Sequence, residues 1–105
     1  MSGGARYLVS TRRRVAPGAT DYDRAWTDLE RAVAGAGANA WRFRAAADDA
    51  AWLEFVEFRG DADPRERSDV AAALRRLSGI APGEVEEWIE TGTQLEERGR
   101  DDVAS

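Results

Sequence analysis

The segment AWLEFVEFRG, at residues 51–60, constrains the fold more than any other part of this sequence. Its residues alternate as in a β-strand, where successive side chains point to opposite faces. One face carries an apolar set with one carboxylate: Trp52, Glu54, Val56 and Phe58. The other face carries a similar set: Leu53, Phe55 and Glu57. Because both faces are largely apolar, we expect a central strand whose sheet is covered on both sides.

Three further segments alternate as strands: residues 6–15, 39–45 and 84–90. In the second of these we expect Trp41 and Phe43 to point toward the helices, and Arg42 and Arg44 to point away from them. Residues 46–50 form the turn that joins this strand to residues 51–60 as a hairpin. The register of the hairpin stays open, because one residue more in the turn exchanges the two faces.

Two helices are predicted from apolar residues at helical spacing. The first helix begins at Thr20 and ends at Gly35 and Gly37. Its apolar stripe consists of Tyr22, Ala25, Trp26, Leu29, Ala32, Val33 and Ala36. The second begins with Asp63 as its cap and Pro64 as its first residue. Its stripe is shorter and consists of Val70, Ala73, Leu74 and Leu77.

The order strand, helix, strand, strand, helix, strand is that of the ferredoxin-like α+β fold. Right-handed crossovers then give a four-stranded antiparallel sheet with both helices on one face. Residues 51–60 lie in the middle of this sheet, beside residues 6–15. We expect one domain over residues 1–90. Residues 91–105 contain too little apolar surface to fold alone, so we expect an acidic, flexible C-terminal tail.

The helices of such a fold leave the second face of the sheet uncovered. Aromatic side chains offer about 150–250 Å² each, so a few of them reach the roughly 300–600 Å² of the largest patch on a typical monomer. Burying about 500 Å² contributes on the order of 10 kcal/mol before the costs of association. We therefore expect a homodimer packed sheet to sheet. Its interface is predicted to include Arg12, Arg44, Glu86 and Trp88.

Several side chains that carry common catalytic chemistry are missing from the sequence. It has no cysteine, histidine or lysine, and all 15 cationic residues are arginine. Thiol nucleophiles, Ser-His-Asp triads, Schiff bases and zinc sites built from Cys and His are therefore excluded. No spacing of Asp and Glu resembles a calcium loop. We expect neither a cofactor nor a metal, and proton chemistry falls to Asp, Glu and Tyr.

The charge balance limits the partners of the protein. The net charge of −5 disfavours nucleic acid, because binding to phosphates needs a cationic surface. No apolar run approaches the roughly 20 residues that span a bilayer, and residues 1–10 lack a secretory pattern. We expect a cytoplasmic protein that contacts neither nucleic acid nor a membrane.

The chain resembles the dimeric α+β barrel superfamily, which includes antibiotic biosynthesis monooxygenase-like proteins. The resemblance lies in RYLVS at the first strand, APGATDYDRAWTDL entering the first helix, and WRFRAAADDAAWLEFVEFRGDAD at the hairpin. It implies a small homodimer with a pocket between sheet and helices. Some members oxidise polycyclic aromatic compounds without metal or flavin, and others degrade haem. This sequence has no histidine to ligate haem or to match the second-helix histidine of many monooxygenase-like members.

Candidate site residues follow from the predicted inner side of the sheet. An aromatic pocket for a flat apolar ligand is predicted from Tyr7, Tyr22, Trp26, Trp41, Phe43 and Trp52, with plain core filling as the alternative. Whichever of Glu54 and Glu57 faces the helices is a candidate general acid or base. Arg13 is a candidate for holding an anionic oxygen. Structural ion pairing and a solvated rim charge are the alternatives for these three residues.

Two functions remain compatible with the sequence. The first is a cofactor-independent, monooxygenase-like enzyme, or a binding protein, for an apolar aromatic or polyketide-like compound. The second is a non-catalytic dimeric module whose aromatic residues only fill the core. An RNA-binding ferredoxin-like domain is a weaker third, because the acidic balance opposes it. A cavity of several hundred Å³ lined by Trp26 and Trp41 would favour the first.

Overall fold

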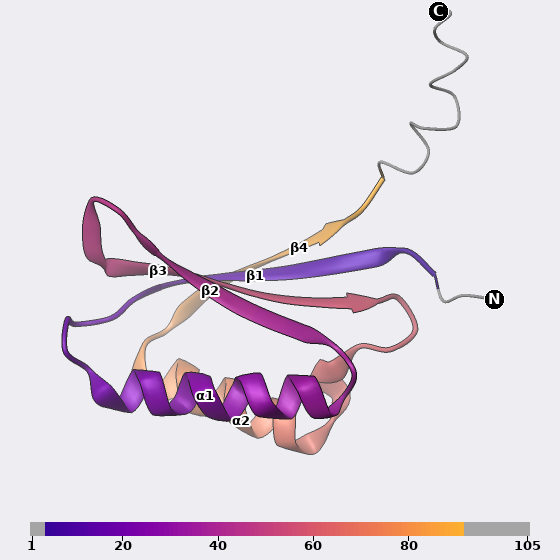
Figure 1. Cartoon of the computed structure of the whole chain (residues 1–105), viewed down its shortest axis with the longest axis horizontal. Helices are drawn as coiled ribbons and strands as arrows, with labels where there is room; N and C mark the ends of the chain where they lie inside the picture. Colours follow the sequence, from indigo (N-terminus) through magenta and orange to yellow (C-terminus); the bar gives the residue numbers. More distant parts are fainter. Residues whose placement is uncertain (1–3, 92–105) are drawn as a thin grey trace, which may run out of the picture.

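A computed structural model describes residues 4–91. Along the chain the elements are β1 (Arg6–Arg14), α1 (Thr20–Gly35), β2 (Asn39–Ala45), β3 (Asp48–Arg59), the 3-10 turn η1 (Pro64–Glu66), α2 (Ser68–Ile80) and β4 (Gly83–Ile89). This order confirms the predicted ferredoxin-like α+β fold (Figure 1). The predicted tail lies outside the described residues except for its first residue. Within residues 4–91, no helix is long and apolar enough to cross a membrane.

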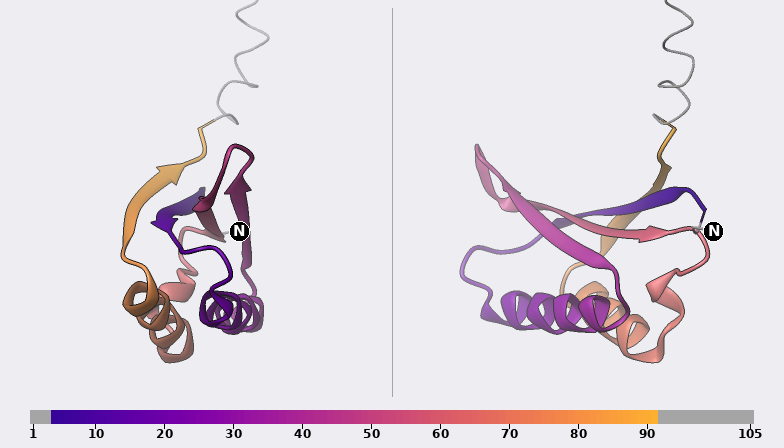
Figure 2. Two further views of the ribbon diagram at one scale, coloured as in Figure 1. Left: turned by 90° about the vertical axis from the view of Figure 1, so that its left-hand side faces the viewer. Right: turned by 45° about the vertical axis from the view of Figure 1, so that its right-hand side comes forward.

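The four strands form one antiparallel sheet in the order β2-β3-β1-β4. Both helices lie on the same side of it, with α1 below the β2–β3 half and α2 below the β4 half (Figure 2). We call the side that packs on the helices the inner face and the opposite side the outer face. β3 and β1 are the central pair, as predicted for residues 51–60 and 6–15.

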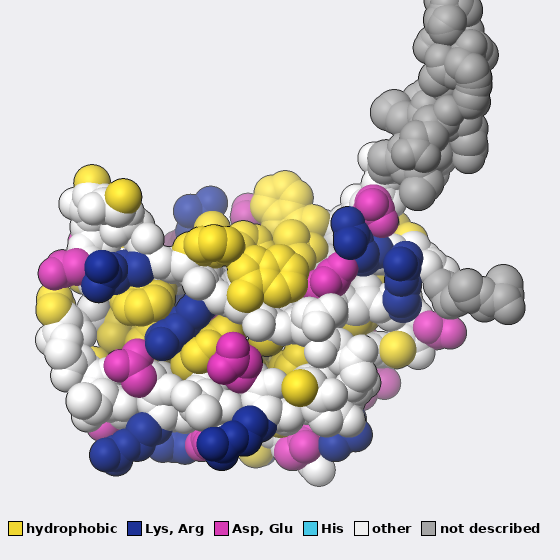
Figure 3. All heavy atoms as spheres, in the orientation of Figure 1, with side chains coloured by type: hydrophobic (Ala, Val, Ile, Leu, Met, Phe, Trp, Pro, Cys, Tyr) yellow, Lys and Arg dark blue, Asp and Glu magenta, His cyan; other side chains and the backbone are white. Residues whose placement is uncertain are grey.

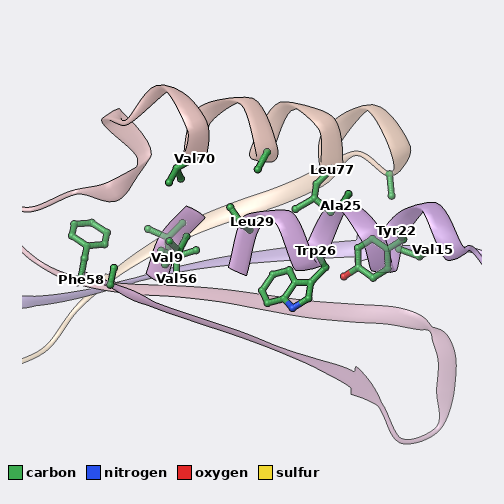
Figure 4. Packing of buried hydrophobic residues seen from close by; sticks show 14 residues of the cluster. Val9, Val15, Tyr22, Ala25, Trp26, Leu29, Val56, Phe58, Val70 and Leu77 are labelled. Carbon is green, nitrogen blue, oxygen red and sulfur yellow. The ribbon is translucent and has the colours of Figure 1, made fainter. Parts of the chain in front are cut away.

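The core lies between the inner face and the two helices (Figure 4). α1 contributes the apolar stripe that its spacing predicts: Tyr22, Ala25, Trp26, Leu29 and Val33 are all buried. From α2 come Val70, Ala73 and Leu77, and from the sheet Val9, Val56 and Phe58. The alternation of β3 is also as predicted, since its buried residues are every second one. β4 differs, because every one of its residues is exposed.

The start of the second helix is not where the sequence predicts it. Asp63 and Pro64 begin η1, in which the Asp63 side chain accepts a hydrogen bond from the backbone N–H of Arg65. Arg67 then has an extended backbone, with φ −76° and ψ 140°, so α2 begins only at Ser68. The prediction that Asp63 caps this helix is wrong because its capping bond closes a single separate turn.

The faces of β2 are the reverse of those predicted. Trp41 lies opposite Phe55 and Phe43 opposite Leu53, which places both aromatic side chains on the outer face. The two arginines lie on the inner face. Arg42 is opposite Glu54 and Arg44 is opposite Trp52, and both of these partners face the helices. Arg44 is therefore on the inner face and not on the face predicted for the dimer interface. Alternation shows which residues share a face, but here both faces carry aromatics, so it does not show which face the helices cover.

Within residues 4–91 nothing covers the outer face, and in the side view of Figure 3, with the helices at the bottom, apolar side chains gather along the upper, sheet side of the molecule. Its apolar members are Leu8, Trp41, Phe43, Leu53, Phe55 and Trp88. Phe43 and Trp88 are each more than half exposed, at 57% and 51%. Trp88 is nevertheless fixed, because its Nε1–H donates to Oγ of Ser10 over 2.9 Å. Arg12 and Glu86, both predicted at the interface, also lie on this face.

Candidate functional site

A buried carboxylate stands at the centre of the inner face. Glu54 of β3 is 2% exposed and accepts two hydrogen bonds at its Oε2 atom. The Nε–H of Arg13 donates one over 2.9 Å, and the hydroxyl of Tyr22 donates the other over 2.8 Å. We call these three residues the carboxylate cluster. The open question of which glutamate faces the helices is thereby answered in favour of Glu54.

Each member of the carboxylate cluster comes from a different element. Arg13 lies on β1, two residues beyond the position opposite Glu54, and it also donates to the backbone oxygen of Ala81 over 2.7 Å. Tyr22 comes from the first turn of α1. Arg13 is only 3% exposed, so neither charge of the ion pair is hydrated by bulk water. Further hydrogen bonds offset part of the cost of burying an ion pair, and here Arg13 donates to Ala81 and Glu54 accepts from Tyr22.

The hydroxyl of Tyr22 remains a proton donor over the working range of pH. Burial is the main cause that raises the pKa of Tyr22 far above its usual value of 10.0, and the negative charge of Glu54 adds to it. The cation of Arg42 acts in the opposite direction but is outweighed. Tyr22 therefore keeps its proton and holds the carboxylate in place.

The predicted aromatic pocket exists in part, and an arginine fills it. Tyr22, Trp26 and Trp52 surround the guanidinium of Arg42, whose Cζ lies 4.9, 5.5 and 4.5 Å from the three ring centroids. Nη2 of Arg42 donates to Asp23 over 3.0 Å. Nη1 is buried and has no hydrogen-bond partner among the described residues. The sequence offers Arg42 or Arg44 as a structural partner of the inward glutamate, but it does not predict that Arg42 lies among these rings, because it places both arginines on the face away from the helices.

A cavity of about 150 Å³ lies next to the carboxylate cluster. Its walls are mostly apolar, and its lining includes Val9, Leu29, Val56, Leu74 and Val85. Thr11, Arg13 and Glu54 are its polar residues on the sheet, while Arg65 and Ser78 add polar groups from η1 and α2. An apolar protein cavity of about this volume holds benzene. Neither Trp26 nor Trp41 lines this cavity, and its volume is smaller than the several hundred Å³ that would favour a ligand pocket between these two residues.

The cavity reaches the surface between β4 and α2. Val85, on the inner side of β4, lines it and is 58% exposed. Both hydrogen bonds to Glu54 among the described residues end at Oε2. Its second oxygen, Oε1, accepts no hydrogen bond from the described residues, and Glu54 lines the cavity.

The remaining predicted site residues lie away from this cavity. Glu57 is on the outer face, where it pairs with Arg6 over 2.9 Å and accepts from Asn39 over 3.3 Å. Tyr7 is on the inner face and stacks on Phe58 at 5.6 Å, nearer the other end of β1. Trp41 and Phe43 flank Phe55 on the outer face, at 5.5 and 5.9 Å. Among residues 4–91, no three acidic side chains are grouped so that they could hold a metal ion.

Comparison with known proteins shows the fold. Neither a protein-family model nor a curated protein sequence matches the chain. SnoaB, a cofactor-independent oxygenase from Streptomyces nogalater, matches 84% of this chain and 95% of its own, with a TM-score of 0.71 and 10% identity. A candidate antibiotic biosynthesis monooxygenase from Caulobacter crescentus matches 85% and 92%, with a TM-score of 0.68 and 14% identity. One from Nitrosomonas europaea matches 88% and 93%, with a TM-score of 0.66 and 8% identity.

The chain therefore has the fold of antibiotic biosynthesis monooxygenase-like proteins, as the resemblance implied. Each match covers most of this chain and most of the matched chain, so the structural similarity extends over nearly the whole domain. At identities this low a shared fold does not carry an activity with it. The activity has to be argued from the carboxylate cluster and its cavity.

Proposed function

We propose that the protein binds a small phenol, about one aromatic ring in size, and oxidises it with O₂ without a cofactor. The observation that carries this proposal is the contact between the apolar cavity and the buried pair of Arg13 and Glu54. The largely apolar walls favour an aromatic ring over water, and the carboxylate among them meets a polar group on that ring. The fold of SnoaB, a cofactor-independent oxygenase, supports the same chemistry.

The chemistry assigned to the site is proton removal. Oε1 of Glu54 accepts the phenol proton, and the guanidinium of Arg13, 2.9 Å from Oε2, stabilises the phenolate that forms. The electron-rich phenolate then reduces O₂ directly. One phenol and one O₂ give one quinone and one water. The substrate loses its O–H and one ring C–H hydrogen and gains one oxygen atom, and the second oxygen atom leaves with both hydrogens as water.

We also propose that the working form is a homodimer joined through the outer faces. Each chain exposes Phe43 and Trp88 there, together with a groove of about 360 Å³ whose lining includes Leu8 and Trp41. An apolar face of this kind marks an interaction surface in a protein of this size. A second copy offers the same apolar face and so covers both at once. A cytoplasmic location stays a prediction from the sequence.

The oxidation is tested by measuring O₂ uptake with single-ring phenols and with anisole, which has no O–H to ionise. We expect uptake and quinone formation with at least one phenol and none with anisole. Glu54→Gln should abolish uptake in the folded protein, while Glu57→Gln, on the same strand but the outer face, should retain it. Binding of phenols without O₂ uptake would contradict the oxidation and favour a binding protein.

A non-catalytic dimeric module is the second candidate. The observation in its favour is that the three rings around Arg42 leave no open aromatic pocket. This candidate requires that no single-ring compound binds at the cavity. Calorimetric titration with phenol and with benzene separates the two, since the module predicts no heat of binding from either compound.

A further inference from the structure

Arg65, which lines the cavity, is held in one position by its own loop. Its Nε–H and Nη2–H donate to the two carboxylate oxygens of Asp63 over 3.0 and 2.8 Å. Its backbone N–H donates to the same carboxylate over 2.9 Å. The guanidinium also lies 5.7 Å from the centroid of the Phe58 ring. A paired, two-bond contact of this kind fixes the plane of the guanidinium, so the remaining N–H groups point in set directions.

The other side of Arg65 has only a weak partner. Nη1 donates to Oε2 of Glu87 on β4 over 2.9 Å, and the Glu87 side chain is 60% exposed. A guanidinium has five N–H donors, and its contacts with Asp63 and Glu87 use three of them. One N–H on Nη1 and one on Nη2 are left. A carboxylate that accepts a hydrogen bond from both terminal nitrogens of Arg65 binds more strongly than an exposed carboxylate that accepts only one.

The two ends of the cavity differ in what they can bind. At the sheet, Oε1 of Glu54 accepts a hydrogen bond from a hydroxyl. On the η1 side, Arg65 lies over Phe58, four residues along β3 from Glu54, and keeps two N–H donors that neither Asp63 nor Glu87 uses. Between them the walls are apolar, with Val9, Val56 and Leu74 among the lining residues. A molecule that matches this order has a hydroxyl, a flat apolar middle and an anionic group at the far end.

We propose that the ligand is a single-ring aromatic carboxylate with a hydroxyl on the opposite side of the ring. This inference rests on the proposed function, because it assigns the substrate class of the same cavity. The hydroxyl meets Glu54, the ring fills the apolar space, and the carboxylate binds the terminal nitrogens of Arg65 in place of Glu87. Arg65 thereby selects the acid over the parent phenol.

The test compares three probes by isothermal titration calorimetry: 4-hydroxybenzoate, phenol and benzoate. The first has both polar groups, and each of the others lacks one. We expect 4-hydroxybenzoate to bind at least about tenfold more tightly than phenol, the effect of one charge-assisted pair. Benzoate should also bind more weakly than 4-hydroxybenzoate, because it lacks the hydroxyl for Glu54. The preference over phenol should shrink as salt is raised.

Two variants assign the preference to Arg65. Glu87→Gln removes the competing carboxylate and should tighten 4-hydroxybenzoate by a few fold while leaving phenol unchanged. Arg65→Gln should reduce the affinity for 4-hydroxybenzoate to that for phenol. Arg76→Gln is the matched control, since Arg76 also forms a partly exposed ion pair, with Asp28 over 2.6 Å, but lies away from the cavity. It should change neither affinity.

The possible results separate this inference from the proposed function. If phenol and 4-hydroxybenzoate bind equally and Glu87→Gln changes neither, the carboxylate assignment is wrong and the phenol site stands. If none of the three probes binds, both proposals are wrong. Tighter binding of 4-hydroxybenzoate that is enhanced by Glu87→Gln supports the assignment even if Arg65→Gln fails to fold.

Discussion

Each face of the sheet carries a group of residues that does not suit its surroundings. The inner face is dry, yet it holds the ion pair of Arg13 and Glu54 and the hydroxyl of Tyr22. The outer face has no cover within residues 4–91, yet it carries Phe43 and Trp88. A buried charge is costly unless it is paired and hydrogen-bonded, and aromatic surface left in water is unfavourable to a smaller extent. This contrast is the basis for proposing chemistry on the inner face and association through the outer face.

The largest effect should come from removing the inner charge. Glu54→Gln leaves the Arg13 guanidinium buried without a counter-ion, which costs about 3–5 kcal/mol in the free energy of unfolding. Glu57→Gln, three residues further along the same strand, removes a partner of the half-exposed Arg6 and should cost at most about 1 kcal/mol. Urea unfolding at one protein concentration measures both. Equal losses would mean that the two faces do not differ in the way described.

The next effect concerns the outer face. Phe43→Glu places a charge on a side chain that is 57% exposed in the single chain, so the fold of each chain should survive. It should weaken dimerisation by about 2 kcal/mol, or roughly 30-fold in Kd. Val85→Glu is matched to it in exposure, at 58%, but lies on the inner side of β4. Sedimentation velocity should show a weaker dimer for Phe43→Glu only. An unchanged Kd for Phe43→Glu would show that the dimer interface does not lie on the outer face.

A smaller effect comes from the buried hydroxyl and depends on pH. Burial and the charge of Glu54 raise the pKa of Tyr22 above its usual 10.0. Above pH 10 the unfolded chain loses this proton while the folded chain keeps it, so the free energy of unfolding falls as pH rises. The slope is about 1.4 kcal/mol per pH unit, and the contribution is fully present below pH 10.

Tyr22→Phe should lack this part of the alkaline slope and lose about 1 kcal/mol at neutral pH, because the hydrogen bond to Glu54 is gone. Unfolding by urea at a series of pH values from 7 to 11 gives both quantities for the two proteins. Parallel curves would show that the Tyr22 hydroxyl is not held by the carboxylate.

The smallest effect should distinguish two arginines on one strand. Arg42→Met removes a guanidinium that lies against three rings and pairs with Asp23, and it should cost about 1 kcal/mol. Arg44→Met, two residues along on the same face, is the control. Arg44 is exposed and has no ion pair among residues 4–91, so its loss should cost close to zero. Thermal unfolding with both variants in parallel detects the difference.

The sequence was sufficient for the fold and for part of the site. The alternation of residues 51–60 and the helical spacing after Thr20 and before Gly79 predict the element order, because burial periodicity is set by local geometry. The alternation of residues 51–60 also predicts which residues of β3 lie on the same face. The sequence also indicates Glu54, Arg13 and Tyr22 as candidate site residues, although nothing in their spacing predicts that they meet.

The faces of β2 and the role of Arg65 were beyond the sequence. The turn at residues 46–47 and the register shift between Arg44 and Ala45 decide which side Trp41 occupies, and both depend on pairing across the hairpin. Aromatic residues on β2 suggested a core position, whereas the structure places them outside. Arg65 follows a capping motif that begins η1 and not α2. Its position at the cavity depends on tertiary packing, including its contact with β4, which the sequence does not predict.

The central claim, that ligand binds on the inner face, is tested most directly by methyl NMR during a titration with phenol. Each face has its own reporters: Val9, Val56 and Leu74 line the cavity, while Leu8 and Leu53 lie on the outer face. The account predicts that the methyl signals of the first three shift in a saturable way and that those of Leu8 and Leu53 do not. Saturable shifts confined to Leu8 and Leu53 would contradict it.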